Sequence, residues 1–156
     1  MGGSVFFGAG VGGNGIKQGL ARGFGLGFHA RHHTIDGFIS HTAENEANYS
    51  IGHDLITTYD ALNAGVSYGL GIYEKKYLLA ALIGIGHTNA DILIKNPDTS
   101  STILFLHEKY IRTCGLIGFQ TALRFGFFGL GIRAYYNVFN GPSNYVILAG
   151  LNLTFK

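Results

Sequence analysis

The sequence has few charged residues, only two prolines, one cysteine and no tryptophan. Charged residues make up 13% of the 156 positions, about half the usual share for a soluble domain. The single Cys114 excludes an intramolecular disulfide framework. The net charge of +2 is small and the basic residues are scattered, which argues against nucleic-acid binding. This composition favours a lipid environment.

The sequence also lacks any apolar run that could cross a membrane as a helix, which takes roughly 18 or more residues. The longest uncharged run, from Ala134 to Phe155, is interrupted by a turn at Asn140-Gly141-Pro142-Ser143-Asn144. The other structure that can span a membrane is a closed β-barrel, in which every backbone polar group is also hydrogen-bonded internally. No signal peptide precedes the first expected strand, so we expect a mature chain in which Met1 replaces a removed leader.

Glycine and aromatic residues are abundant, with 25 glycines, 9 tyrosines and 12 phenylalanines. The sequence alternates with a period of two, most clearly in the last twelve residues before Lys156, where one of the two faces is wholly apolar. The glycines recur in phase, at Gly8, Gly10 and Gly12, at Gly65, Gly69 and Gly71, at Gly84 and Gly86, and at Gly129 and Gly131. Because glycine weakens a strand, this repetition predicts a crowded barrel interior, with the large apolar side chains facing lipid.

We therefore predict one domain over residues 1–156, an all-β, eight-stranded antiparallel up-and-down transmembrane β-barrel. The strands are expected at Ser4–Gly12, Gly19–His32, Ile35–Glu44, Tyr59–Ile72, Tyr77–Asn89, Tyr110–Phe125, Gly129–Phe139 and Asn144–Phe155. The alternation is ambiguous in the third strand. Tight turns near 33–34, 73–76 and 126–128 alternate with longer connections, which predicts periplasmic turns, extracellular loops and two periplasmic termini. Interfacial girdles are expected from the aromatics near strand ends: Tyr73, Tyr77, Tyr110, Phe125, Phe127, Phe128, Tyr145 and Phe155.

The strand rhythm, the loop alternation and the segment Gly150-Leu151-Asn152-Leu153-Thr154-Phe155 resemble the OmpA-like eight-stranded barrels, and more closely the small uncharacterised outer-membrane barrels of Gram-negative bacteria. The resemblance covers nearly the whole chain. It implies a place in the outer membrane, contact with outer-membrane lipid, and recognition of the terminal segment by the barrel assembly machinery. The chain departs from the pattern because it ends in Lys156 rather than in the aromatic residue. The resemblance implies no cofactor.

Long polar side chains that share the phase of the glycines are candidates for a polar network in the lumen. They are Arg31, Arg112, Gln120, Arg124 and Arg133. Because an unpaired interior charge is expensive, the arginines need partners, and Glu44, Glu46 and Glu108 are the candidates. A packed, ion-paired interior predicts no wide pore.

A second candidate site is a protruding extracellular hairpin around the turn signal Asn96-Pro97-Asp98. Its apolar residues are Ile92, Leu93, Ile94, Ile103, Leu104, Phe105 and Leu106. Either they pack on the other loops, or they offer an edge and a patch to an extracellular protein or lipid ligand.

Three other patterns receive less weight. Gly8, Gly10 and Gly13 match GxGxxG, but no helix pattern follows, so we interpret them as lumen glycines. His29, His32, His33 and His41 are typical of a metal cluster, yet we expect them at a turn and on the lumen face. His53-Asp54 with Ser50 or His107 has the residue types of a lipid A-modifying site, but nothing in the sequence fixes their positions relative to one another.

We therefore expect a structural or surface-interaction barrel with binding specificity in its extracellular loops, and neither a catalytic nor a metal site. The alternatives from other classes are a lipid-modifying enzyme, a narrow channel and a soluble lipocalin-type barrel. The last predicts charged outer strand faces, whereas those faces have Leu62, Val66, Leu70, Ile117, Phe119, Leu123, Ile132 and Val138.

Overall fold

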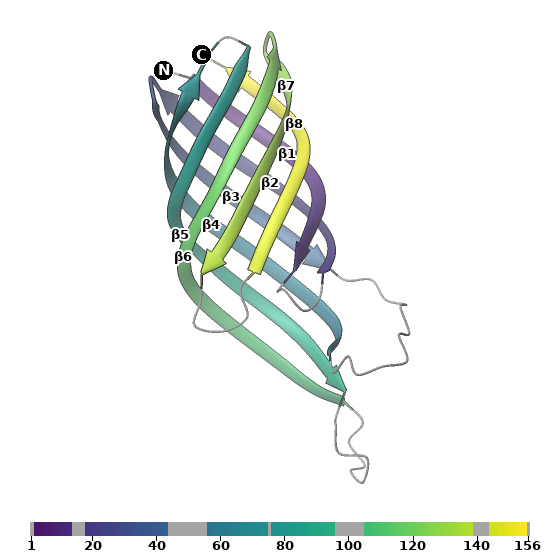
Figure 1. The fold of residues 1–156 in the computed structure, drawn as a ribbon. Coiled ribbons are helices and arrows are strands. Elements are labelled where there is room, and N and C mark those ends of the chain that lie inside the picture. The colour runs from purple at the N-terminus through teal and green to yellow at the C-terminus, as the bar shows by residue number, and fades with distance from the viewer. Residues whose placement is uncertain are drawn as a thin grey trace.

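The computed structural model describes residues 2–13, 18–43, 56–74, 76–95, 105–138 and 144–155. These ranges contain no helix long and apolar enough to cross a membrane. They form eight strands: β1 (Gly2–Gly13), β2 (Gln18–Ala30), β3 (His33–Ala43), β4 (Ile56–Tyr73), β5 (Tyr77–Lys95), β6 (Phe105–Phe125), β7 (Phe128–Val138) and β8 (Asn144–Phe155). Each strand pairs antiparallel with the next and β8 pairs with β1, so the sheet closes into a barrel (Figure 1).

The eight predicted strands are confirmed, and the largest differences from prediction lie in β5 and β6. Strand β5 ends at Lys95 rather than at residue 89, and β6 begins at Phe105 rather than at residue 110. The first tight turn lies at Arg31 and His32 rather than at 33–34. Both termini lie at the end of the barrel that holds the short turns, which we call the turn end (Figure 1). We call the opposite end, from which the other connections leave, the loop end.

The barrel is narrow because it has eight strands, and these strands are strongly staggered. A path through paired residues that starts at Gly3 and passes round all eight strands returns to β1 at Gly13, ten residues further along. Eight strands with such a stagger tilt by roughly 35–45° and enclose a space just wide enough for side chains. Interior side chains from opposite strands therefore meet.

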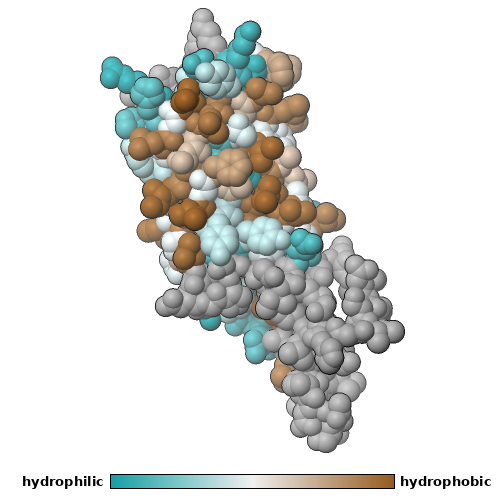
Figure 2. Space-filling view, in the orientation of Figure 1, coloured by the Kyte–Doolittle hydropathy of each residue, from teal (hydrophilic) through white to brown (hydrophobic). Residues whose placement is uncertain are grey.

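The outer face of the barrel is apolar over most of its height, as the alternation predicted. The eight outer residues named for β4, β6 and β7 are all between 42% and 62% exposed. Figure 2 shows this apolar surface as a brown band, with hydrophilic residues gathered towards the turn end. Exposed aromatic residues lie at the turn end: Tyr77, Phe125, Phe127, Phe128 and Phe155. Tyr73 and Tyr110 do not join them, because both pack against buried interior clusters.

The inner face has little room beside its glycines, as their phase predicted. A Cβ atom added at Gly25 would lie 2.1 Å from Nη1 of Arg133, and one added at Gly65 would lie 2.6 Å from the Phe38 ring. At Gly23 the nearest atom would be Cδ1 of Leu148, at 2.6 Å. The glycines of one wall therefore make space for long side chains from other strands.

Candidate functional site

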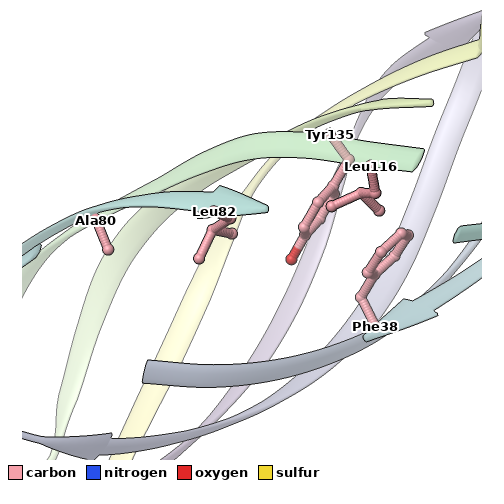
Figure 3. Close-up of a cluster of buried hydrophobic side chains, with 5 residues drawn as sticks. All are labelled: Phe38, Ala80, Leu82, Leu116 and Tyr135. Atoms are coloured by element: carbon pink, nitrogen blue, oxygen red, sulfur yellow. The ribbon is translucent and has the colours of Figure 1, made fainter. Parts of the chain in front are cut away.

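Five buried apolar side chains from four strands meet inside the barrel (Figure 3). They are Phe38 on β3, Ala80 and Leu82 on β5, Leu116 on β6 and Tyr135 on β7. The rings of Phe38 and Tyr135 stack with 3.9 Å between their centroids. This cluster is built across the barrel axis, because β3 and β7 are not neighbours in the sheet.

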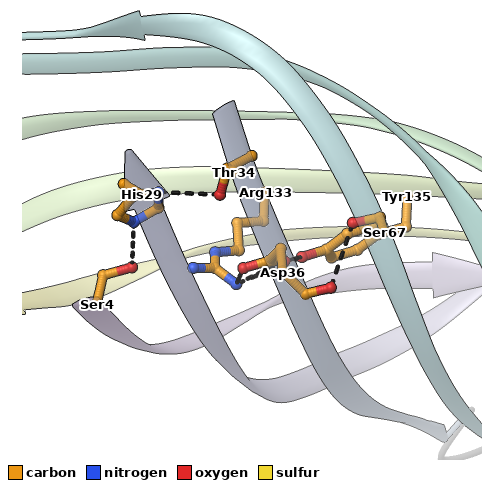
Figure 4. A network of polar contacts seen from close by, with 7 residues as sticks. All are labelled: Ser4, His29, Thr34, Asp36, Ser67, Arg133 and Tyr135. Atoms are coloured by element: carbon orange, nitrogen blue, oxygen red, sulfur yellow. Dashed lines mark hydrogen bonds and ion pairs between the residues drawn. The ribbon is translucent and has the colours of Figure 1, made fainter. Parts of the chain in front are cut away.

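A buried ion pair lies next to this cluster. Nη1 of Arg133 is 2.7 Å and 3.0 Å from the two carboxylate oxygens of Asp36, and the Tyr135 hydroxyl donates a hydrogen bond of 2.7 Å to the same carboxylate (Figure 4). The side chains of Arg133 and Asp36 are 3% and 0% exposed. The guanidinium also lies 4.7 Å from the centroid of the Phe6 ring. Both buried charges are therefore compensated by hydrogen bonds and by each other.

Nearer the turn end, the His29 ring lies between two hydroxyl groups (Figure 4). Nε2 is 2.8 Å from Oγ of Ser4, and Nδ1 is 2.9 Å from Oγ1 of Thr34. A serine, a histidine and an orienting group at these distances are the elements of an activated nucleophile. Ser4 and His29 are only 1% and 7% exposed, however, so no substrate has access to the hydroxyl. The arrangement holds a buried ring in one orientation and is not an active site.

Neutral polar residues occupy the interior near the loop end. Oγ1 of Thr88 donates a hydrogen bond of 2.8 Å to Asn63, and Nδ2 of Asn137 donates one of 3.1 Å to Thr88. The Tyr59 hydroxyl donates a bond of 2.7 Å to Oδ1 of Asn144.

The five residues predicted for the lumen lie in different environments in the structure. Gln120 and Arg133 are buried inside the barrel, and Arg124 is half-buried near the turn end, where Nη1 donates to the Glu74 carbonyl at 3.4 Å. Arg31 and Arg112 are exposed. Arg31 left the interior because the strand ends one residue before it and the turn begins there.

Arg112 has the interior parity, but β7 pairs with β6 only as far as Gly115 in the described residues. Beyond Gly115 no described residue of β7 pairs with β6, and the Arg112 side chain is exposed. The Arg112 guanidinium lies 5.6 Å from the centroid of the Tyr110 ring.

Sequence reasoning missed Asp36, which is the partner of Arg133. The proposed partners do not fill this role: Glu108 is exposed on β6, and residues 44 and 46 lie outside the described residues. The signal was present in β3, where Thr34, Asp36 and Ser40 share one parity and are all buried. The outward Gly37 and the inward Phe38 concealed it, because they reverse the pattern of small residues inside and large residues outside.

At the loop end, β4, β5 and β6 extend beyond the other strands and form what we call the sheet extension (Figure 1). Ile92 of the predicted hairpin is 5% exposed and packs with Tyr59, Ala61 and Ala90. Leu93 is half-buried and Leu106 is 41% exposed. Residues 103 and 104, and the side chains of Ile94 and Phe105, lie outside the described part of the structure.

The histidines do not converge on one site. His29 is inside, His32 is in the turn, and His33 and His41 are on the outer face, where Nε2 of His41 is 3.1 Å from both carboxylate oxygens of Asp60. Within the described ranges, no three His, Cys, Asp or Glu side chains are grouped as a metal site requires. His107 pairs with Asp91 on the outer face of the sheet extension. The other residues of the lipid A-modifying set, at 50, 53 and 54, are outside the described ranges.

The sequence matches no family model and no curated protein. Solved structures do match over nearly the full length. Ail, the attachment invasion locus protein of Yersinia pestis, is similar with a TM-score of 0.63 and 14% identity, over 99% of this chain and 97% of that chain. The N-terminal β-barrel domain of Pseudomonas aeruginosa OprF has a TM-score of 0.59 and 13% identity, over 99% and 96%. Neisserial surface protein A has a TM-score of 0.54 and 10% identity, over 97% and 95%.

The chain has the fold of the small eight-stranded outer-membrane β-barrels. The expected resemblance to such barrels is thereby confirmed at the level of the fold. A second Ail structure, with a TM-score of 0.63 and 15% identity over 99% of this chain and 97% of that chain, was solved in complex with the heparin analogue sucrose octasulfate.

Proposed function

We propose that the chain is an integral protein of the bacterial outer membrane with a closed interior, and that it acts as a structural or surface-interaction barrel through its loop end. The apolar outer band supports the membrane location, because a barrel in water would need polar outer faces. Short turns are typical of the periplasmic side, so the loop end faces outwards. Biogenesis then involves the barrel assembly machinery, and the band contacts outer-membrane lipid.

The observation that supports an interaction role is the β6 edge of the sheet extension. In the described residues, the β6–β7 ladder ends at Gly115 and Val138, whereas β6 itself continues to Phe105. Backbone donors and acceptors along such an edge can pair with an extended segment of another protein. Ile111 and Leu106 add exposed apolar surface on the same strand, 61% and 41% exposed. The ligand we propose is therefore an extracellular protein that contributes a strand.

The closed interior is supported by the contacts across the barrel axis. The Phe38–Tyr135 stack and the Asp36–Arg133 pair join opposite walls. Water can occupy the remaining polar sites. We do not propose an open path through the barrel for large solutes. No catalytic step is proposed either, because the serine–histidine pair in the described interior is inaccessible.

A shortened sheet extension tests this function. Replacing residues 89–111 by Asn-Gly joins Thr88 to Arg112, which are partners across β5 and β6, through a two-residue hairpin turn, and it removes both Leu106 and Ile111. Cells displaying the full chain, the shortened chain or no chain are compared for adhesion to a mammalian cell monolayer and to immobilised heparin. Heparin is included because the similar Ail structure holds its analogue.

We expect the full chain to increase adhesion to the monolayer and the shortened chain to lose the increase. Both chains should keep the heat-dependent gel shift of a folded barrel. Equal adhesion by the full and shortened chains would refute the role of the extension. Adhesion only to heparin would favour a polyanion over a protein strand as the ligand. Absence of the gel shift from membrane fractions would refute the membrane barrel itself.

A further inference from the structure

The outer face of β2 to β5 contains a groove of about 650 Å³. Its floor is formed where Gly37 and Ala64 face outwards. A Cβ atom added at Gly37 would meet nothing closer than 3.9 Å, so the floor is open rather than occupied by a neighbouring side chain. The larger residues that line the groove are Phe24, Leu26, Ile39, Val66 and Ile85.

The lining of the groove is almost entirely apolar. The one ionisable residue in it is His87, whose Nδ1 is 3.1 Å from Oγ1 of Thr113 on β6. The groove lies within the apolar band, at a height where a membrane presents hydrocarbon chains. A linear acyl chain can follow such a depression, whereas a flat outer face offers only its side-chain tips.

A cation lies at the loop-end side of this groove. Arg22 is two residues from Phe24 on the same face of β2, and its cross-strand partner is His41. Arg22 is exposed and has no ion-pair partner among the described residues. The Asp60 carboxylate, on the outer face of β4, is bound by His41. Arginine on an outer strand face is costly at the bilayer centre and tolerated near the interface, where its guanidinium can bind phosphate in a bidentate manner.

We propose that the groove and Arg22 together bind one phosphorylated acyl lipid of the outer leaflet. A hydrocarbon chain lies over Gly37 and Ala64, and the phosphate accepts hydrogen bonds from the Arg22 guanidinium. The charge at one end of an apolar groove selects this ligand over a second copy of the chain, which would have to bury Arg22 against its own apolar band. The inference depends on the proposed function only in that the barrel must span a membrane.

Two variants and two matched controls test the site. Arg22→Gln removes the cation, and Gly37→Leu fills the groove. The control for the first is Arg31→Gln, which removes an exposed arginine at the turn end. The control for the second is Ala149→Leu, because Ala149 is exposed on the outer face of β8, which pairs with β1 and β7 and not with a strand of the groove.

The folded proteins, in micelles of a neutral detergent, are mixed with phosphatidylglycerol or phosphatidylcholine of identical chains, and bound lipid is counted by native mass spectrometry. We expect one phosphatidylglycerol to be retained about tenfold better than phosphatidylcholine, as one charge-assisted hydrogen-bonded contact predicts. Arg22→Gln should abolish the preference, and Gly37→Leu should reduce retention of both lipids. Both controls should behave as the unmodified chain, and inorganic phosphate should not compete.

Equal retention of the two lipids by the unmodified chain would overturn the proposal. Retention that neither variant changes would overturn it too. Loss of a dimer rather than of lipid in Gly37→Leu would assign the groove to a second copy of the chain. In each of these cases the heat-dependent gel shift would still report a folded barrel, so failure of the lipid site is distinguishable from failure of the proposed membrane location.

Discussion

Substitution of one interior glycine tests how the barrel wall is packed. In Gly25→Ala, the new methyl carbon would lie 2.1 Å from Nη1 and 3.1 Å from Cζ of Arg133. Arg133 cannot move freely, because it is 3% exposed and is bound to Asp36. Overpacking of a filled interior costs about 1–3 kcal/mol, and displacement of the guanidinium from Asp36 adds to this. We therefore expect a loss of about 2–4 kcal/mol in the free energy of unfolding.

The matched control is Gly37→Ala, where the added carbon faces outwards with no atom closer than 3.9 Å. We expect this change to be neutral or to stabilise by about 0.5–1 kcal/mol, because alanine has less conformational entropy to lose than glycine. Urea unfolding in lipid vesicles, followed by the heat-dependent gel shift, measures both. In Gly25→Ala with Arg133→Ala the clash is absent, so the added cost of the alanine should largely disappear. An equal cost of Gly25→Ala in both backgrounds would refute the steric explanation.

Three further predictions concern the interior. Arg133→Met leaves the Asp36 carboxylate buried without its cation and should cost about 3–5 kcal/mol, whereas Arg133→Met with Asp36→Leu should recover most of the loss in the same urea assay. Tyr59→Phe removes the hydrogen bond to Asn144 and should cost about 1 kcal/mol, with an unchanged gel shift. In planar bilayers the unmodified barrel should show no large stable conductance, and observation of one would contradict the closed interior.

Much of the fold could be predicted because two independent sequence patterns agree with it. Glycines in phase, such as Gly65 and Gly69, lie where an added side chain would meet Phe38 or Leu82. Outer residues such as Val66 and Leu123 alternate with them and are exposed. Period-two patterns depend only on neighbouring residues, so they can be recognised in the sequence without knowledge of the tertiary structure.

Contacts between distant strands could not be predicted in this way. The Asp36–Arg133 pair joins residues 97 positions apart. It forms because the stagger of the strands places the two residues on opposite walls at the same height along the barrel axis. The sequence does not state that stagger. The same gap explains Arg112, whose parity is correct but whose enclosure depends on how far β7 extends. For Arg31, a shift of the turn by two residues was enough to change its side of the wall.

The pairing of β1 with β8 also has a consequence for how the chain folds. This seam joins Gly3 to Phe155, so it closes a loop of almost the whole chain, whereas the β5–β6 ladder joins residues such as Ile94 and Leu106. Loop-closure entropy opposes contacts between residues that are distant in the sequence. We therefore expect the β5–β6 hairpin to form early and the β1–β8 seam to form last. Until then β1 and β8 are two unpaired edges, and the nascent protein is at its most vulnerable to aggregation.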